Sequence, residues 1–382
     1  MLTTLLQQDA VPFETLHARY GALLVLVRKL IGVVPNCDPF LEIWPTAFRT
    51  YNVMVPNFLN LPFVVWGRGP REAIGLAMYI ASRTAGCPYC SAHSCSFALR
   101  RGASPEQIAA SMNGGAALSP AQQAVVRTAR ALASVPVQAP DDLSQHYSLA
   151  DAEWIVLSIA MMGWLNKVMD ALGVPLEVST VAEVNAIIAP SGWTPGRHLR
   201  ELPADGPPPR VDTLRSKLGV VPLIPSAVAL DRRWMKGVPG TWPRVGEFLR
   251  TATGHDFPVL SQLRHRRAIR AIATMIRDNF DAASSVLGRQ AKLATGLIFA
   301  DAVGSPGLAA ALRATGATPT PESALTALAR AISPSPAEVD AAVVERSRAL
   351  PPAGIVELVS FLAVLQMLHR LSAYFPMQQQ LA

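Results

Sequence analysis

The sequence predicts an all-α protein in which one helical unit occurs twice and forms an intramolecular pseudo-dimer. Most long segments carry apolar residues at helical spacing together with Ala, Leu, Arg and Gln, and few show the alternation typical of strands. Ser-Pro and Thr-Pro pairs precede several of these segments, as expected where a helix begins. Similar blocks also recur 218 residues apart, which is typical of a tandem repeat.

The first unit is predicted to cover residues 1–188. The segment that begins at Arg71 has a helical pattern. Ser104 and Ser119, each followed by Pro, mark the expected starts of two further helices. A long apolar helix then ends at Gly173, because Gly is the preferred residue just past a helix.

Residues 189–210 form a predicted linker, because they are rich in Pro and Gly and lack an apolar period. The second unit, residues 211–382, has its own helix starts, with one expected at Thr320 before Pro321. It contains no cysteine. The second unit is therefore predicted to be a degenerate copy that fills the place of a second subunit.

Two separate blocks support the repeat. The segment starting at Arg71 reads REAIGLAMYIASRTAGCP, and the one starting at Arg289 reads RQAKLATGLIFADAVGSP. AVVRTARAL at 124–132 is matched by AVVERSRAL at 342–350, again 218 residues later. Because two blocks keep one offset, chance is a poor explanation.

Composition and charge narrow the classes of protein. Of the 382 residues, 50% are apolar and 16% are charged, which indicates a well-packed chain and not a disordered one. The net charge of +7 is scattered, with one dense run at 264–267, and no nucleic-acid motif accompanies it. The longest apolar run, at 21–27, is far shorter than the roughly 20 residues of a membrane helix. With no secretory signal visible, we expect a cytoplasmic protein with reduced thiols and neither nucleic-acid nor membrane partners.

Three of the four cysteines, Cys87, Cys90 and Cys95, lie close together around His93. In Cys-Pro-Tyr-Cys, Pro88 is expected in the first turn of a helix, and a helix N-terminus lowers the pKa of a thiol. Cys90 and His93 are three residues apart, so their side chains lie about 60° apart around a helix axis. A base at this spacing can activate a thiol as a nucleophile.

Two other interpretations of the cluster stay open. Free cysteines are often fully buried, so Cys87 and Cys90 could simply pack in an Ala-rich core. Together with His93 and Cys95 they could also bind zinc, although four ligands along one short helix do not surround a tetrahedral ion. We favour dithiol chemistry without a metal or cofactor, and expect Cys95 to be a buried packing residue.

These residues resemble a known family, the alkyl hydroperoxidase D-like and carboxymuconolactone decarboxylase-like all-α proteins. The resemblance rests on an acidic residue in one helix, a Gly before Cys-x-x-Cys, a His one turn later, then RRGAS, LSPAQQAVVRTARAL and IVLSIAMMGWLNKVMDALGVPLE. It covers residues 10–186 and, in weaker form, 211–375. It implies a fusion of two helical bundle repeats of this type.

The resemblance also implies a thiol-dependent peroxidase. Cys90 would attack the peroxide and Cys87 would resolve the product as a disulfide, while His93 and Glu72 would relay the proton. The implied partners are a small-molecule substrate such as an organic hydroperoxide and a dithiol protein that reduces the disulfide. Because members of this family assemble through helical faces, the fused pseudo-dimers are expected to associate further.

Three further residues are candidates for the substrate pocket. Tyr89 could line the pocket or cap the start of the helix. Ser94 stands where the family usually has its histidine, because the family spacing is Cys-x-x-Cys-x-x-x-His. Trp164 belongs to an apolar stripe at helical spacing, which is more often core packing than substrate lining.

The carboxylate also departs from the family pattern. The family's Glu usually lies twelve residues before the first cysteine of the motif, where this chain has Gly75. Glu72 is one helical turn earlier, a shift of about 5 Å along the axis. A solvated or capping role for Glu72 therefore stays open beside the relay.

Two other functions are retained as alternatives. The first is a non-redox decarboxylase-like lyase or pathway-specific biosynthetic enzyme on the same scaffold, in which His93 does acid–base work. The second is a binding or scaffold protein, which the degenerate second copy would allow. Fold alone does not choose between them.

Overall fold

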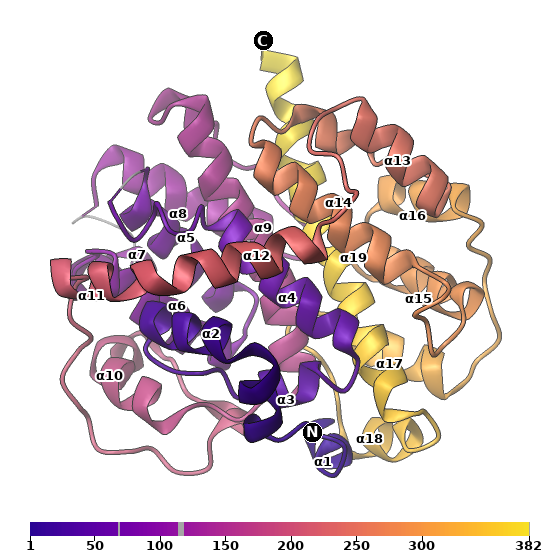
Figure 1. The fold of residues 1–382 in the computed structure, drawn as a ribbon, viewed down its shortest axis with the longest axis horizontal. Coiled ribbons are helices and arrows are strands. Elements are labelled where there is room, and N and C mark those ends of the chain that lie inside the picture. The colour runs from indigo at the N-terminus through magenta and orange to yellow at the C-terminus, as the bar shows by residue number, and fades with distance from the viewer. Residues whose placement is uncertain (68, 114–117, 382) are drawn as a thin grey trace.

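The computed structural model describes the backbone of residues 1–67, 69–113 and 118–381, and their side chains except those of 215, 216 and 376–381. Every regular element in these ranges is a helix, which confirms the all-α prediction. The two longest helices, α9 (Leu149–Leu172) and α19 (Pro352–Leu381), pack against each other at the centre (Figure 1).

The remaining helices surround this central pair. In the first half they are α1 (Thr3–Leu6), α2 (Phe13–Ile31), α3 (Asp38–Leu41), α4 (Pro45–Phe58), α5 (Arg71–Thr84), α6 (Pro88–Arg100), α7 (Pro105–Met112), α8 (Pro120–Ala133) and α10 (Val178–Ile188). In the second half they are α11 (Leu214–Val220), α12 (Ile224–Trp234), α13 (Arg244–Thr253), α14 (Arg266–Phe280), α15 (Arg289–Ala302), α16 (Pro306–Ala314), α17 (Ala324–Ile332) and α18 (Ala341–Ser347). Short 3₁₀ turns lie at η1 (Leu143–Gln145), η2 (Ala189–Ser191), η3 (Gly196–His198), η4 (Val221–Leu223) and η5 (Pro258–Gln262).

The helix starts follow local capping chemistry. Ser104 and Ser119 begin α7 and α8 with complete capping boxes, in which each hydroxyl accepts from a backbone N–H three residues on. The start expected at Thr320 is wrong, because Ser323 caps α17 instead. Gly173 ends α9 in the left-handed conformation (φ +70°), as predicted.

The two halves share one core. Besides the central pair, α4 of the first half packs against α14 of the second. Helices α11 and α12 cross over α2, and α12 also reaches α4, so the start of the second half covers part of the first (Figure 1). Buried apolar side chains form one cluster that includes residues of both halves.

The Pro- and Gly-rich segment 189–210 is more than a spacer. Its Trp193 is buried, and the indole N–H donates to the carbonyl of Pro88 at 3.2 Å. His198 is also buried, and its carbonyl accepts from the N–H of Leu176 at 2.8 Å. The first part of the predicted linker therefore packs onto the helix that carries the cysteines.

Two turns in the two halves have matching geometry. Gly86 (φ +68°) and Gly304 (φ +63°) follow α5 and α15 in the left-handed conformation. In each turn the next residue closes a backbone hydrogen bond to the helix, from Cys87 N to Ser82 O at 3.1 Å and from Ser305 N to Ala300 O at 2.8 Å. These turns are 218 residues apart, as the sequence blocks are.

The second pair of sequence blocks occupies different structural places. The block 124–132 lies in α8, which packs on α5, whereas 342–350 contains α18, which packs on α17. The helix that packs on α15 as α8 packs on α5 is α17. Matching backbone bonds follow α8 and α17, from residue 138 to 131 at 3.0 Å and from residue 338 to 331 at 2.7 Å. These two matching bonds lie 200 residues apart, whereas the sequence blocks lie 218 apart.

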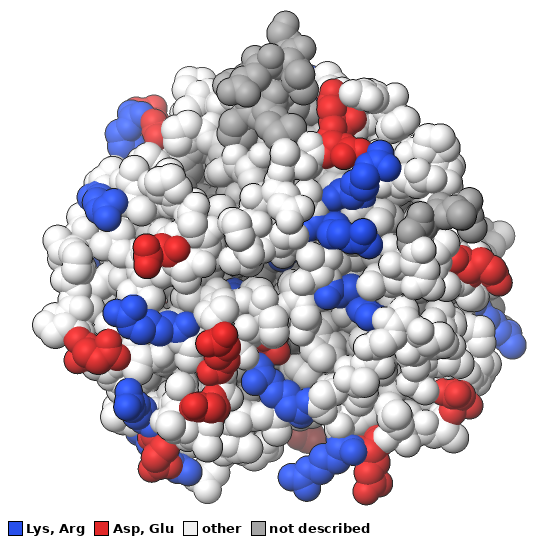
Figure 2. Space-filling model, turned by 180° about the vertical axis from the view of Figure 1, so that it is seen from behind, with Lys and Arg blue, Asp and Glu red and all other residues white. Residues whose placement is uncertain are grey.

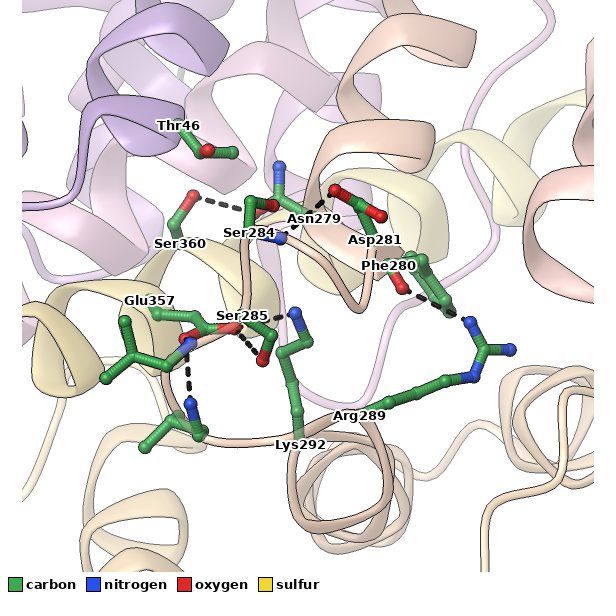
Figure 3. A network of polar contacts seen from close by, with 12 residues as sticks. Thr46, Asn279, Phe280, Asp281, Ser284, Ser285, Arg289, Lys292, Glu357 and Ser360 are labelled. Carbon is green, nitrogen blue, oxygen red and sulfur yellow. Dashed lines mark hydrogen bonds and ion pairs between the residues drawn. The ribbon is translucent and has the colours of Figure 1, made fainter.

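A buried ionic network holds the loop before α15 (Figure 3). Lys292 Nζ lies 2.7 Å from Glu357 Oε1, and both side chains are fully buried. The same carboxylate accepts from the Ser285 hydroxyl at 2.6 Å and from the backbone N–H groups of Val286 and Leu287 at 2.7 and 3.1 Å. Each oxygen of the buried Glu357 carboxylate therefore accepts two hydrogen bonds, which replace those that water would supply.

Helices α9 and the segment Pro352–Phe375 of α19 are long and apolar enough to cross a membrane by length and composition alone. In the most apolar 18-residue stretch of each helix, 94% of the residues of α9 and 83% of those of α19 are buried inside the protein. This burial fits their place as the two central helices of the core. On the face shown in Figure 2, Lys and Arg side chains are interspersed with Asp and Glu, apart from a short column of Lys and Arg to the right of centre.

Candidate active site

Cys87 and Cys90 begin helix α6. Cys87 is the N-cap residue, and its sulfur accepts from the backbone N–H of Cys90 at 3.3 Å. Pro88 occupies the first turn, where a missing N–H costs no helical bond. Both thiols are reduced and buried. The structure thus brings the two cysteines together at a helix N-terminus, as predicted.

His93 pairs with a carboxylate that sequence analysis did not select. Its Nε2 lies 2.6 Å from Oε2 of Glu177, in the segment between α9 and α10. Oε1 of the same carboxylate accepts from the Tyr89 hydroxyl at 2.8 Å and from the Asn36 backbone N–H at 2.6 Å. Tyr89 and His93 also have their ring centroids 4.5 Å apart. Glu177 therefore fixes both side chains of α6 from outside the helix.

The electrostatic environment keeps Glu177 ionised. Burial alone would raise its pKa, but proximity to His93 and the hydrogen bonds from His93, Asn36 and Tyr89 lower it below the ordinary value. A carboxylate in this state can hold and orient the imidazole beside it.

Glu72 does not reach His93. Its Oε1 accepts from the side-chain amides of Gln107 at 2.8 Å and Gln122 at 2.5 Å, the capping-box residues of α7 and α8. The physical reason is the packing of α5 on α6: a Cβ at Gly75 would lie 2.7 Å from Cα of Ala98. The helices touch there, so α5 has no room for a carboxylate at the family position. Glu72 lies one turn further from the cysteines.

A cavity of about 80 Å³ lies beside Cys90. Its walls are largely apolar and are lined by Ile31, Pro35, Cys37, Tyr51, Val55, Leu59, Met78, Tyr89, Cys90, His93, Ser94, Phe97, Met161, Met162, Leu165 and Met169. Tyr89 and Ser94 line the cavity, and their contact with a substrate stays a prediction. The Ser94 hydroxyl donates to the carbonyl of Cys90 at 2.5 Å, so in this conformation its hydrogen serves the helix.

Trp164 lies behind the cavity wall and not in it. Its side chain is fully buried and stacks on Tyr51, with ring centroids 6.1 Å apart and planes 17° apart. Of these two aromatic residues, Tyr51 lines the cavity and Trp164 does not. Trp164 therefore supports the pocket through packing, in line with the core alternative.

Cys37 and Asp38 join the site from the start of α3, where Cys37 is the N-cap residue and Asp38 is the first helical residue. Cys37 is buried and lines the cavity, and its sulfur lies 3.9 Å from Oδ1 of Asp38. Burial, together with the charges of Glu177 and Glu42, raises the pKa of Asp38 to about 8. Asp38 is thus mostly protonated at neutral pH while Glu177 is ionised, a separation typical of acid–base sites. In the sequence, the one sign that Cys37 could belong to the site is that the chain has only four cysteines and the other three lie around His93.

The environment of Cys90 favours its protonated thiol over the thiolate. Burial raises the pKa of Cys90 well above its ordinary value, and Cys87, Asp170 and Cys37 raise it further. Cys95 is fully buried and does not line the cavity. In the part of the chain that the structure describes, no three His, Cys, Asp or Glu side chains are grouped as ligands for a metal ion.

Comparison of the chain with protein-family models, with curated proteins and with solved structures gives no match.

Proposed function

We propose that the protein is a thiol-dependent peroxidase, or a closely related dithiol oxidoreductase, with one dithiol per chain. The observation that carries the proposal is the Cys87–Cys90 pair at the start of α6, beside a small cavity that His93 also lines, with His93 held by Glu177. A thiol pair, a base and room for a small molecule meet at one place.

The chemistry follows from these groups. The Cys90 thiol loses its proton to His93, and the thiolate attacks the distal oxygen of a hydroperoxide, which breaks the O–O bond. The products are a sulfenic acid on Cys90 and an alcohol, which takes up the proton. The Cys87 thiol then attacks the sulfenic sulfur, forms the disulfide and releases water. A dithiol reductant returns two electrons and two protons by exchange.

Glu177 takes the role that the resemblance would give to Glu72. Its negative charge stabilises the imidazolium that forms when His93 accepts the thiol proton. The hydrogen bond from Tyr89 and the short distance to His93 support this assignment.

A second candidate function is acid–base catalysis without redox chemistry, as in a lyase. The protonated Asp38 and the ionised Glu177 close to each other support it, because such a pair can give and take protons at one site. In that case Cys87 and Cys90 would be packing residues, and their replacement would leave turnover intact.

We also propose that the chain is a tandem fusion whose halves form a pseudo-dimer, with residues 1–188 and 211–382 as the two units. The matched turns support it, and so does a reciprocal contact across the interface. A Cβ at Gly86 would lie 3.1 Å from Cδ of Pro336, and one at Gly304 would lie 4.0 Å from Cβ of Pro136. The Gly86 turn thus meets the turn after α17, and the Gly304 turn meets the turn after α8.

A cytoplasmic location, a dithiol protein as reductant and an organic hydroperoxide as substrate complete the proposal. Reduced thiols fit that compartment. The apolar lining of the cavity suits a small alkyl substituent on the peroxide.

The test is peroxide consumption by the full chain with dithiothreitol as reductant. Cys90→Ser is expected to abolish turnover, and Cys87→Ser to stop the protein at the sulfenic acid after one event. Cys95→Ser is the matched control and should keep wild-type turnover, because Cys95 does not line the cavity. Equal turnover in wild type and Cys90→Ser would contradict the proposal.

A further inference from the structure

The cavity beside Cys90 is the first of three apolar cavities that adjoin one another. The second has a volume of about 50 Å³ and the third a volume of about 60 Å³. The first and second share the side chains of Ile31, Tyr51, Val55, Leu59 and Phe97. The second and third share those of Leu23, Leu26, Leu30, Asn52, Pro56 and Leu61. Apolar lining therefore continues beyond the cavity that Cys90 lines.

Helix α12 of the second half covers the third cavity. It packs on α2 and α4 (Figure 1), the two helices that supply most of the shared side chains. Ile224 and Val228 of α12 line the third cavity together with residues of α2 and α4. The third cavity thus lies between the two halves of the chain.

The third cavity adjoins a wider pocket that is rich in arginine, which we call the arginine pocket. It has a volume of about 610 Å³ and shares Leu61, Pro62, Ile224, Val228, Asp231 and Arg267 with the third cavity. Its charged lining residues are Arg232, Arg266, Arg267, Arg270 and Asp231. Arg232 and Arg266 are exposed, so the pocket is open to solvent. The dense basic run at 264–267 supplies two of these arginines.

Asp231 cannot neutralise all of the positive charge of the arginine pocket. Arg267 donates through Nε to Oδ1 of Asn57 at 2.5 Å and through Nη1 to the carbonyl of Leu61. Nη2 of Arg270 donates to a backbone carbonyl at 2.8 Å, while its buried Nε has no hydrogen-bond partner. Among the residues that the structure describes, none of the four arginines forms an ion pair. Neutral oxygens thus hold two guanidiniums in place and leave their charge for an anion.

We propose that the substrate is a long-chain fatty-acid hydroperoxide, whose carboxylate binds in the arginine pocket and whose chain follows the apolar cavities to Cys90. This inference deepens the proposed function and rests on it for the reaction itself. Small cavities in series fit one chain and not two, which favours a fatty acid over a phospholipid. The O–O bond breaks as the Cys90 sulfur takes the distal oxygen, and the chain leaves as the hydroxy acid.

The assignment divides the work between the two halves of the chain. The first half carries the dithiol, whereas the arginines that would hold the carboxylate all belong to the second half. A half without cysteine then has a chemical part in substrate binding.

Binding is measured on the intact chain by displacement of a dansyl-labelled fatty acid. The competitors are oleate, octanoate and oleyl alcohol, none of which carries a peroxide. Oleate is expected to bind about 100-fold more tightly than octanoate, because each buried methylene strengthens binding about fourfold. It should also bind more tightly than oleyl alcohol, which has no charge for the arginines. Equal affinities of oleate and oleyl alcohol, or of oleate and octanoate, would overturn the proposal.

A double variant tests the arginine pocket. Arg232→Gln with Arg266→Gln removes two exposed charges of the pocket and is expected to weaken oleate binding about tenfold. Arg313→Gln with Arg346→Gln is the matched control, because it removes two exposed arginines that do not line the pocket. The control should bind oleate as wild type does. Equal weakening in the two double variants would show an effect of net charge alone and overturn the proposal.

A single substitution tests the path of the chain. Leu26 is partly buried in α2 and lines both the second and the third cavity, so Leu26→Trp fills the space between them. It is expected to weaken oleate binding about tenfold. Val25→Trp is the matched control, because Val25 is 38% exposed on the same helix and lines none of the three cavities. Wild-type affinity in a folded Leu26→Trp protein would count against the proposal.

Turnover of wild type separates this inference from the proposed function. With linoleic acid hydroperoxide, kcat/KM should exceed that with tert-butyl hydroperoxide. If oleate binds through the arginine pocket but no hydroperoxide is consumed, the peroxidase fails and the fatty-acid site stands. If wild type consumes tert-butyl hydroperoxide but oleate binding does not depend on Arg232 and Arg266, the fatty-acid site fails and the peroxidase stands.

Discussion

At the scale of single residues, the site depends on one carboxylate that is distant in sequence from the cysteines. Glu177 lies 84 positions after His93, yet their side chains are 2.6 Å apart. Glu72 lies closer to His93 in sequence and serves instead as an acceptor for two capping-box glutamines. Proximity along the chain was thus a poor guide to the carboxylate that contacts His93.

Replacement of these two carboxylates separates their roles. Glu177→Gln should lower peroxide turnover about 100-fold or more, the usual cost of losing acid–base assistance. Glu72→Gln is the matched control and should keep turnover within a few fold of wild type, because Glu72 contacts α7 and α8 and not His93. Steady-state rates with hydrogen peroxide check both. Equal losses in the two variants would contradict the assignment to Glu177.

Glu177 should also make stability depend on pH. Its folded-state pKa lies below its unfolded value, so its contribution is fully present above the unfolded pKa of roughly 4.5. That contribution is lost as the pH falls through the lower folded-state pKa. Urea denaturation between pH 6 and 3 should therefore show a smaller loss of stability in Glu177→Gln than in wild type. Parallel losses in both proteins would show that the depressed pKa is not a stability determinant.

At the scale of helices and loops, local chemistry predicted well and long-range packing did not. Ser104, Ser119 and Gly173 mark helix ends as expected, because each acts on a backbone within a few residues. At Thr320 the same signal misled, since Ser323 three residues later makes the cap. The similarity between residues 124–132 and 342–350 did not reveal that the two segments occupy different places in the fold.

The loop before α15 provides a test at this scale. Lys292 and Glu357 are fully buried partners (Figure 3), so removing one of them strands the other. Lys292→Met or Glu357→Gln alone should lower the free energy of unfolding by about 3–5 kcal/mol. The double variant should lose less than the sum of the two, because neither charge is then left alone. Denaturant unfolding measures all three, and strictly additive losses would contradict the coupling.

At the scale of the whole molecule, a cysteine-bearing half and a cysteine-free half share one core. The all-α class and a dithiol at a helix start followed from periodicity, Pro positions and cysteine spacing. The contact of Pro336 with Gly86 could not be predicted from these features, because it depends on how the two halves pack against each other. The position of Cys37 in the cavity lining could not be predicted either, because the tertiary fold brings this part of the chain to the cavity.

In the proposed reaction Cys90 and Cys87 react as a pair. The most direct measurement is mass spectrometry of the intact, reduced protein after one equivalent of hydrogen peroxide, with proteolytic mapping of the thiols. We expect a Cys87–Cys90 disulfide, with Cys37 and Cys95 still free. Four unmodified thiols after the peroxide is consumed, or a disulfide that leaves Cys90 free, would contradict it.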